Sequence, residues 1–111
     1  MPGSFEQRER AFEAKWAHDE ELRFKVYARR NKLLGLWAVA EMGVTGPAAD
    51  TYAQEVIAAD LERAGDEDVF EKVRRDFDTR GVAISDHMLR RKMAELLEQA
   101  KHQIAMEATK S

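Results

Sequence analysis

The strongest basic cluster in the sequence could bind a phosphate. Arg29, Arg30 and Lys32 lie within four consecutive residues. Guanidinium and ammonium groups bind phosphate oxygens, and Trp37 or Tyr27 could supply an aromatic face for stacking. The alternative is an exposed, hydrated helix face, which is the commoner role of such a charge run. Both interpretations stay open at this point.

The three histidines show no catalytic or metal-binding pattern. His18, His87 and His102 lie far apart, and none has a second histidine or a cysteine at metal-ligand spacing. His18 and His87 each stand beside an aspartate, but neighbouring residues of a helix point about 100° apart. We therefore interpret them as capping or surface residues and expect no metal site.

No other arrangement of residues indicates an enzyme. The glycines match neither of the common phosphate-binding loop patterns, and each fits a turn. Asp76 and Asp78 have no evident ligand partners and are interpreted as surface charges. No nucleophile stands in a recognisable motif with a base. We expect no catalytic residue and no required cofactor, and we predict that the protein is not an enzyme.

The composition excludes several other classes of protein. A formal net charge of −3 argues against a dedicated nucleic-acid binder, which usually carries a basic excess. Cysteine is absent, so no disulfide or thiolate metal site can form. The N-terminus lacks the apolar stretch of a signal peptide, and no apolar run is long enough for a membrane span. We expect a cytoplasmic protein with no direct membrane insertion.

The chemistry-bearing residues must be positioned by helices. Apolar residues recur with helical spacing over residues 20–42, 46–64, 66–79 and 85–106, and we find no strand candidate. Gly43 is typical of a helix C-cap, and Ser85 of an N-cap. We predict an all-α fold: a four-helix bundle over residues 20–111 with an N-terminal extension, residues 1–19, that is helical or partly disordered.

Two apolar stripes run along the first 42 residues, and they differ in phase. Phe5, Phe12 and Trp16 share one face of a helix. The second stripe sits about 75° round the helix from the first. Its residues are Leu22, Val26, Leu33, Trp37 and Ala40.

The first stripe has two possible roles. The second stripe can pack against the later helices, whereas the first has no evident internal partner, which suggests a surface for another protein. The alternative is that the three aromatic residues fold back on the bundle, or that the helix bends near Asp19. A contact with a small peripheral core is the commoner fate of such residues.

Four stretches of the sequence resemble one protein family. Residues 12–25, 28–37, 64–78 and 82–87 look like the zeta subunit of the alphaproteobacterial F-type ATP synthase. These stretches are long and uninterrupted, and the resemblance extends over nearly the whole chain. Trp16 replaces what is often phenylalanine, which keeps that face apolar.

The resemblance implies a four-helix bundle that inhibits ATP hydrolysis. It implies that residues 2 to about 19 insert between an alpha and a beta subunit, near the gamma subunit, and block rotation in the hydrolysis direction. Apolar side chains would anchor this segment and charged ones would fix its register at the rim. The implied partner-binding residues are Phe5, Glu6, Arg8, Glu9, Arg10, Phe12, Glu13, Lys15 and Trp16.

The resemblance also implies that ADP or ATP binds the bundle as a regulatory ligand. Without a standard nucleotide motif, the expected site is the basic cluster with Trp37. We expect the free protein to be a monomer and to act peripherally on the soluble head of the ATP synthase. Two alternatives are a bundle that mainly senses adenine nucleotides and a helical adaptor of another complex.

Overall fold

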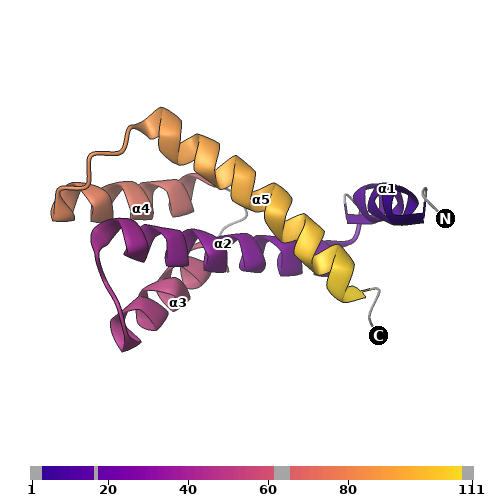
Figure 1. The fold of residues 1–111 in the computed structure, drawn as a ribbon, viewed down its shortest axis with the longest axis horizontal. Helices are drawn as coiled ribbons and strands as arrows, with labels where there is room; N and C mark the ends of the chain where they lie inside the picture. The colour runs from indigo at the N-terminus through magenta and orange to yellow at the C-terminus, as the bar shows by residue number, and fades with distance from the viewer. Residues whose placement is uncertain (1–3, 17, 62–65, 109–111) are drawn as a thin grey trace.

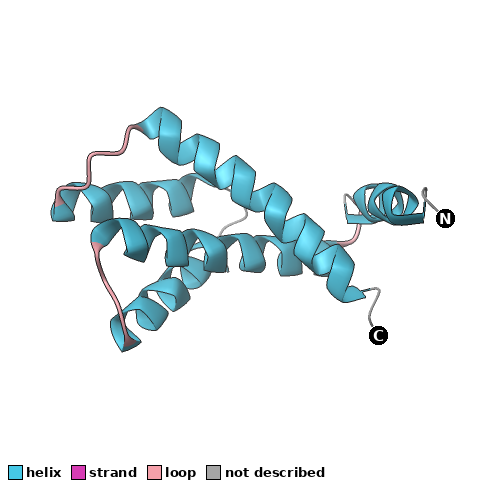
Figure 2. Cartoon of the chain, viewed as in Figure 1, coloured by secondary structure: helices cyan, strands magenta, loops and turns pink. Residues whose placement is uncertain are grey.

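The structure is a computed structural model that describes residues 4–16, 18–61 and 66–108. Five helices make up this part of the chain, and it contains no strand (Figures 1 and 2). The helices are α1 (Ser4–Trp16), α2 (Glu20–Met42), α3 (Pro47–Leu61), α4 (Asp66–Arg80) and α5 (Asp86–Ala108). The predicted all-α bundle is therefore confirmed. None of the described helices is both long and apolar enough to cross a membrane.

Local capping interactions set the ends of the helices. The carboxylate of Asp19 accepts a hydrogen bond from the Leu22 N–H at 3.0 Å and begins α2. Gly43 ends α2 with φ of 74°, a left-handed conformation that favours glycine. The Ser85 hydroxyl accepts the Met88 N–H at 3.2 Å and begins α5. The predicted caps at Gly43 and Ser85 are confirmed.

Helix α2 is the central element of the fold. It contacts α3, α4 and α5, while α3 and α5 lie on different sides of it (Figure 1). Helix α1 contacts α5 and α2, and it lies at the end of the molecule where α2 begins and α5 ends (Figure 1). The molecule is elongated, with extents of 48 × 28 × 27 Å.

The apolar side chains form two cores, and the half-buried Leu33 packs against both. The main core lies among α2, α3, α4 and α5, and its residues are Leu34, Ala38, Val56, Val69, Phe70, Val73, Phe77, Leu89, Met93 and Leu96. The second core is smaller and consists of Val26, Ala100 and Ile104. It joins α2 to α5, and side chains of α1 pack against it.

The buried face of α2 differs from the predicted stripe. Val26 is buried as expected, but Ala40 is exposed, and Leu34 and Ala38 are buried instead. The reason is that α2 is covered on more than one side, so its buried positions do not follow one line. A Cβ placed on Gly35 would lie 2.8 Å from the Ala53 Cα, which shows how closely α3 approaches α2.

Asp76 is a structural residue, contrary to its interpretation as a surface charge. Its carboxylate accepts a hydrogen bond from the Tyr52 hydroxyl at 2.7 Å, and the Lys72 ammonium lies 3.2 Å away. Burial of Tyr52 and the hydrogen bond to Asp76 raise the pKa of the Tyr52 hydroxyl above its usual value. Asp78 also has a partner, because Arg74 donates to it at 2.9 Å. These contacts link α3 to α4 and stabilise α4 itself.

Candidate functional site

The N-terminal helix α1 docks on the small second core. Phe12 and Trp16 are half-buried and pack against the cluster of Val26, Ala100 and Ile104. Of the two roles left open for this stripe, packing on the bundle is the one that the structure shows for Phe12 and Trp16. His18 and Asp19 are not helical, so α1 and α2 are two separate helices. This break allows α1 to pack against the bundle. The side chain of Phe5 lies outside the described residues.

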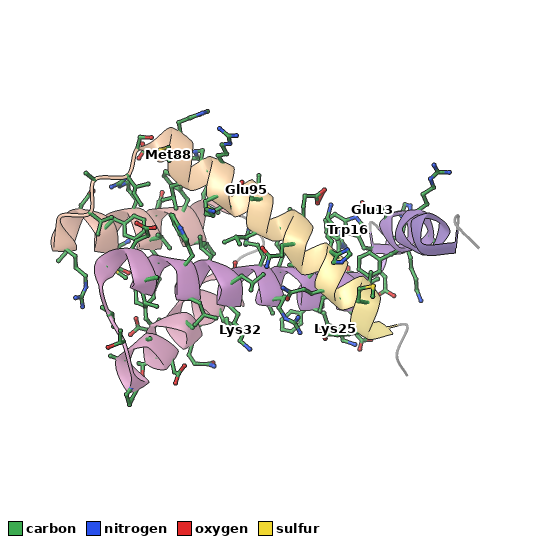
Figure 3. The ribbon with its side chains drawn as sticks, viewed as in Figure 1. Glu13, Trp16, Lys25, Lys32, Met88 and Glu95 are labelled. Atoms are coloured by element: carbon green, nitrogen blue, oxygen red, sulfur yellow. The ribbon has the colours of Figure 1, made fainter. Side chains whose placement is uncertain are left out.

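A lysine of α5 fixes Trp16 in this position. The Lys101 Nζ lies 4.1 Å from the centroid of the Trp16 ring, a distance at which the ring attracts a cation. The same ammonium is 3.6 Å from a Glu13 carboxylate oxygen, and the Trp16 indole N–H donates to that oxygen at 3.2 Å. Figure 3 shows Glu13 and Trp16 on α1 facing the C-terminal half of α5. Residues of α1 and α5 thus share one polar network.

The structure describes the side chains of three of the charged residues predicted for partner binding. Arg10, Glu13 and Lys15 are exposed. The side chains of Glu6, Arg8 and Glu9 lie outside the described residues. Glu13 is paired with Lys101 and accepts the Trp16 N–H, whereas Arg10 and Lys15 are exposed while the two aromatic residues face the bundle.

Sequence reasoning missed the α5 half of this site. The helix predicted over residues 85–106 contains Ala100, Lys101 and Ile104. The sequence carries one weak signal, because the helix predicted over residues 85–106 is longer than the helix predicted over residues 66–79. Only the fold-back of α1 brings Lys101 next to Trp16, and the sequence does not specify that turn.

The basic cluster of α2 is divided among different partners. Arg30 is 1% exposed, and its guanidinium donates to Asp66 at 2.9 Å and to Asn31 at 2.7 Å. Arg29 donates to Glu107 at 2.6 and 2.9 Å, and to Gln103 at 2.8 Å. These two arginines therefore connect α2 to α4 and to α5.

The other two members of the predicted nucleotide site lie apart from those contacts. Lys32 is exposed and extends outward from α2 (Figure 3). Trp37 is half-buried, with its ring 5.6 Å from that of Phe77 and the Lys92 ammonium 5.7 Å from its centroid. Nucleotide binding by Arg29, Arg30, Lys32 and Trp37 stays a prediction. Among the described residues, no group of three or more histidine or acidic side chains could hold a metal ion.

Comparison with known proteins decides the family. The sequence model of the ATPase inhibitor subunit zeta matches residues 2–103, which includes α1 and most of the bundle. The chain belongs to this family. The predicted relationship to the zeta subunit is therefore confirmed, and membership supports a role as an inhibitor associated with the F-type ATP synthase.

Structural similarity agrees with this membership. A protein structure determined by solution NMR is 43% identical in sequence, with a TM-score of 0.68. The match covers 78% of this chain and 98% of the solved one. No curated protein matches the chain. The packing of α1 on the bundle therefore bears on how an inhibitor of this family acts.

Proposed function

We propose that this protein inhibits ATP hydrolysis by the F-type ATP synthase, and that residues 1–19 form the inhibitory segment. The segment inserts between an alpha and a beta subunit, next to the gamma subunit. Residues 20–111 form the bundle that carries it. Family membership supports the inhibitory role, and the position of α1 supports the assignment of the role to this segment.

The observation that carries this assignment is that none of the described side chains of α1 contributes to the main core. Its large described apolar side chains, Phe12 and Trp16, pack on the small cluster of Val26, Ala100 and Ile104, and the Trp16 ring also lies 6.1 Å from that of Tyr27. An isolated helix of 13 residues is only marginally stable in water, so α1 depends on whatever surface it contacts. A second surface on the ATPase can supply equivalent contacts without unfolding the bundle.

The segment has the composition of a protein-binding helix. Phe12 and Trp16 are large aromatic residues, the type most often found at the energetic centre of an interface. Arg10, Glu13 and Lys15 would remain at the rim, where charges fix orientation more than they add affinity. A wedge that fits only one rotational state of the motor holds the motor in that state.

Truncation of an aromatic anchor tests this proposal. Trp16→Ala and Phe12→Ala should each weaken inhibition about thirtyfold, because the loss of a large buried anchor costs about 2 kcal/mol or more. Phe24→Ala is the matched control, since Phe24 is a large apolar residue of α2 that is 56% exposed and lies outside the segment. The measurement is steady-state ATP hydrolysis at increasing inhibitor concentration.

The Phe24→Ala variant separates the loss of an anchor from the general effect of removing a large apolar side chain. Inhibition by Phe24→Ala should match that of the unchanged protein. Equal inhibition by all three variants, each with a helical circular dichroism spectrum, would contradict the assignment of the anchors. An equal loss in all three would place the contact on the bundle as much as on α1.

A further inference from the structure

The contact between α1 and α5 occupies the same side chains that the proposed function gives to the ATPase. Phe12 and Trp16 pack on the second core, and the Trp16 ring lies under the Lys101 ammonium at 4.1 Å. A side chain packed in this way cannot also enter a pocket on another protein. Docking on the bundle and insertion into the ATPase are therefore mutually exclusive for these residues.

Lys101 is built into this contact rather than placed on the open surface. Its side chain is only 14% exposed, and its ammonium lies between Glu13 of α1 at 3.6 Å and Glu98 of α5 at 3.1 Å. Burial of a lysine side chain is costly unless its charge is compensated. Here Glu13, Glu98 and the Trp16 ring compensate the charge. Two of these three groups belong to α1.

We propose that the docking of α1 on this face, with Lys101 as the latch, is autoinhibitory. The proposal rests on the proposed function, because it assumes that α1 is the inhibitory segment. When α1 is docked, the protein cannot inhibit; when α1 leaves, Phe12 and Trp16 become available. The apparent affinity for the ATPase then equals the intrinsic affinity multiplied by the fraction of molecules in which α1 is undocked.

The charged groups around Lys101 allow the contact between α1 and α5 to break. Glu13 is half-exposed, with 51% of its side chain accessible, so water can replace its bond to Lys101. After release, Lys101 keeps Glu98, one turn away on the same helix. The surface uncovered on the bundle is the small second core, while the main core is unchanged. Opening therefore separates α1 without disturbing the rest of the fold.

The helix α5 contains a closely matched control for Lys101. Lys92 also lies over a tryptophan, with its Nζ 5.7 Å from the Trp37 ring, and it also pairs with a glutamate three residues later, Glu95, at 3.0 Å. The difference is that Trp37 belongs to the bundle, whereas Trp16 belongs to α1. Lys92→Gln and Lys101→Gln therefore remove the same charge and the same type of ring contact.

The test combines inhibition with a direct measurement of docking in the full-length protein. The two indole N–H signals in an ¹H–¹⁵N NMR spectrum report separately on Trp16 and Trp37. Lys101→Gln should move the Trp16 signal toward its solvent-exposed position and lower the concentration for half-inhibition by about twofold to tenfold, as expected for one cation–π contact with one ion pair. Lys92→Gln should move the Trp37 signal and leave inhibition unchanged.

Each result separates this proposal from the proposed function. Release of Trp16 without stronger inhibition would overturn the autoinhibitory role while leaving the inhibitory segment in place. An unmoved Trp16 signal in both Lys101→Gln and the stronger variant Lys101→Glu would overturn the assignment of the latch to Lys101. Failure of the unchanged protein to inhibit at any concentration would instead contradict the proposed function.

Discussion

Arg30 is the largest fully buried side chain among the described residues, although it carries a charge. Its guanidinium bonds to Asp66 and Asn31 and lies 5.2 Å from the centroid of the Tyr27 ring. These groups satisfy it inside the protein, so a phosphate would have to displace Asp66 to reach it. A nucleotide at this part of α2 would therefore meet the exposed ammonium of Lys32 first.

The exposed position of Lys32 makes the predicted nucleotide site testable at a single residue. ADP should shift the amide NMR signals of residues 29–37, and Lys32→Ala should reduce the shifts, whereas Lys25→Ala, at another exposed lysine of α2, should not. Added salt should weaken the effect, because exposed charges are screened over about 10 Å at 0.1 M salt. Shifts confined to another pair of helices would show that this placement is wrong.

Tyr52 gives the protein a pH dependence in the alkaline range. Burial and the hydrogen bond to Asp76 raise its pKa above 10.0, the value expected in the unfolded chain. Because the folded-state pKa is the higher one, the stabilisation is complete below about pH 10 and is lost as pH rises toward the folded-state pKa. The difference in unfolding free energy between the unchanged protein and Tyr52→Phe should therefore shrink above about pH 10. Urea unfolding at several pH values measures it, and a constant difference up to pH 11 would contradict this account.

At the scale of the elements, the crossing of α2 and α3 depends on the absence of a side chain at Gly35. An added Cβ would lie 2.8 Å from the Ala53 Cα and 3.3 Å from its Cβ. Alanine favours a helix over glycine by about 1 kcal/mol. The two helices would have to separate, however, and overpacking of a core costs about 1–3 kcal/mol. We expect Gly35→Ala to lower the unfolding free energy in urea, and a gain of about 1 kcal/mol would show that the crossing can relax.

The helices could be predicted because helical spacing and capping depend on local sequence. Helical spacing predicted helices over residues 66–79 and 85–106, and the apolar residues Val73, Phe77, Leu89 and Met93 within them are buried. Capping residues marked the ends of α2 and α5. Arg30 was missed because its burial depends on Asp66, which is 36 residues away. A run of basic residues carries no information about such a distant partner.

At the scale of the whole molecule, the fold-back of α1 was the feature that the sequence left undecided. The difference in phase between the two stripes correctly separated Phe12 and Trp16 from the main core. It could not show whether those residues face the bundle or solvent, because that depends on the turn between α1 and α2. The candidate site was therefore predicted on its α1 side, whereas Lys101 and its neighbours on α5 were not.

The separation of the cores predicts that the bundle survives without α1. A chain that begins at Glu20 keeps every residue of the main core. It loses the packing of Phe12 and Trp16 on the second core, so we expect a modest fall in melting temperature, with about 4–8 °C for each kcal/mol lost in a domain of this size. Circular dichroism should still show a cooperative transition. A molten or unfolded chain would indicate that α1 belongs to the folding unit.

The same shortened chain tests the central claim that residues 1–19 carry the inhibition. The measurement is ATP hydrolysis by the matching F-type ATPase at increasing concentrations of the full-length and the shortened protein, each verified as folded by circular dichroism. We expect the full-length protein to inhibit and the chain that begins at Glu20 to have no effect on hydrolysis. Undiminished inhibition by the folded, shortened bundle would contradict the account and move the inhibitory surface to helices α2–α5.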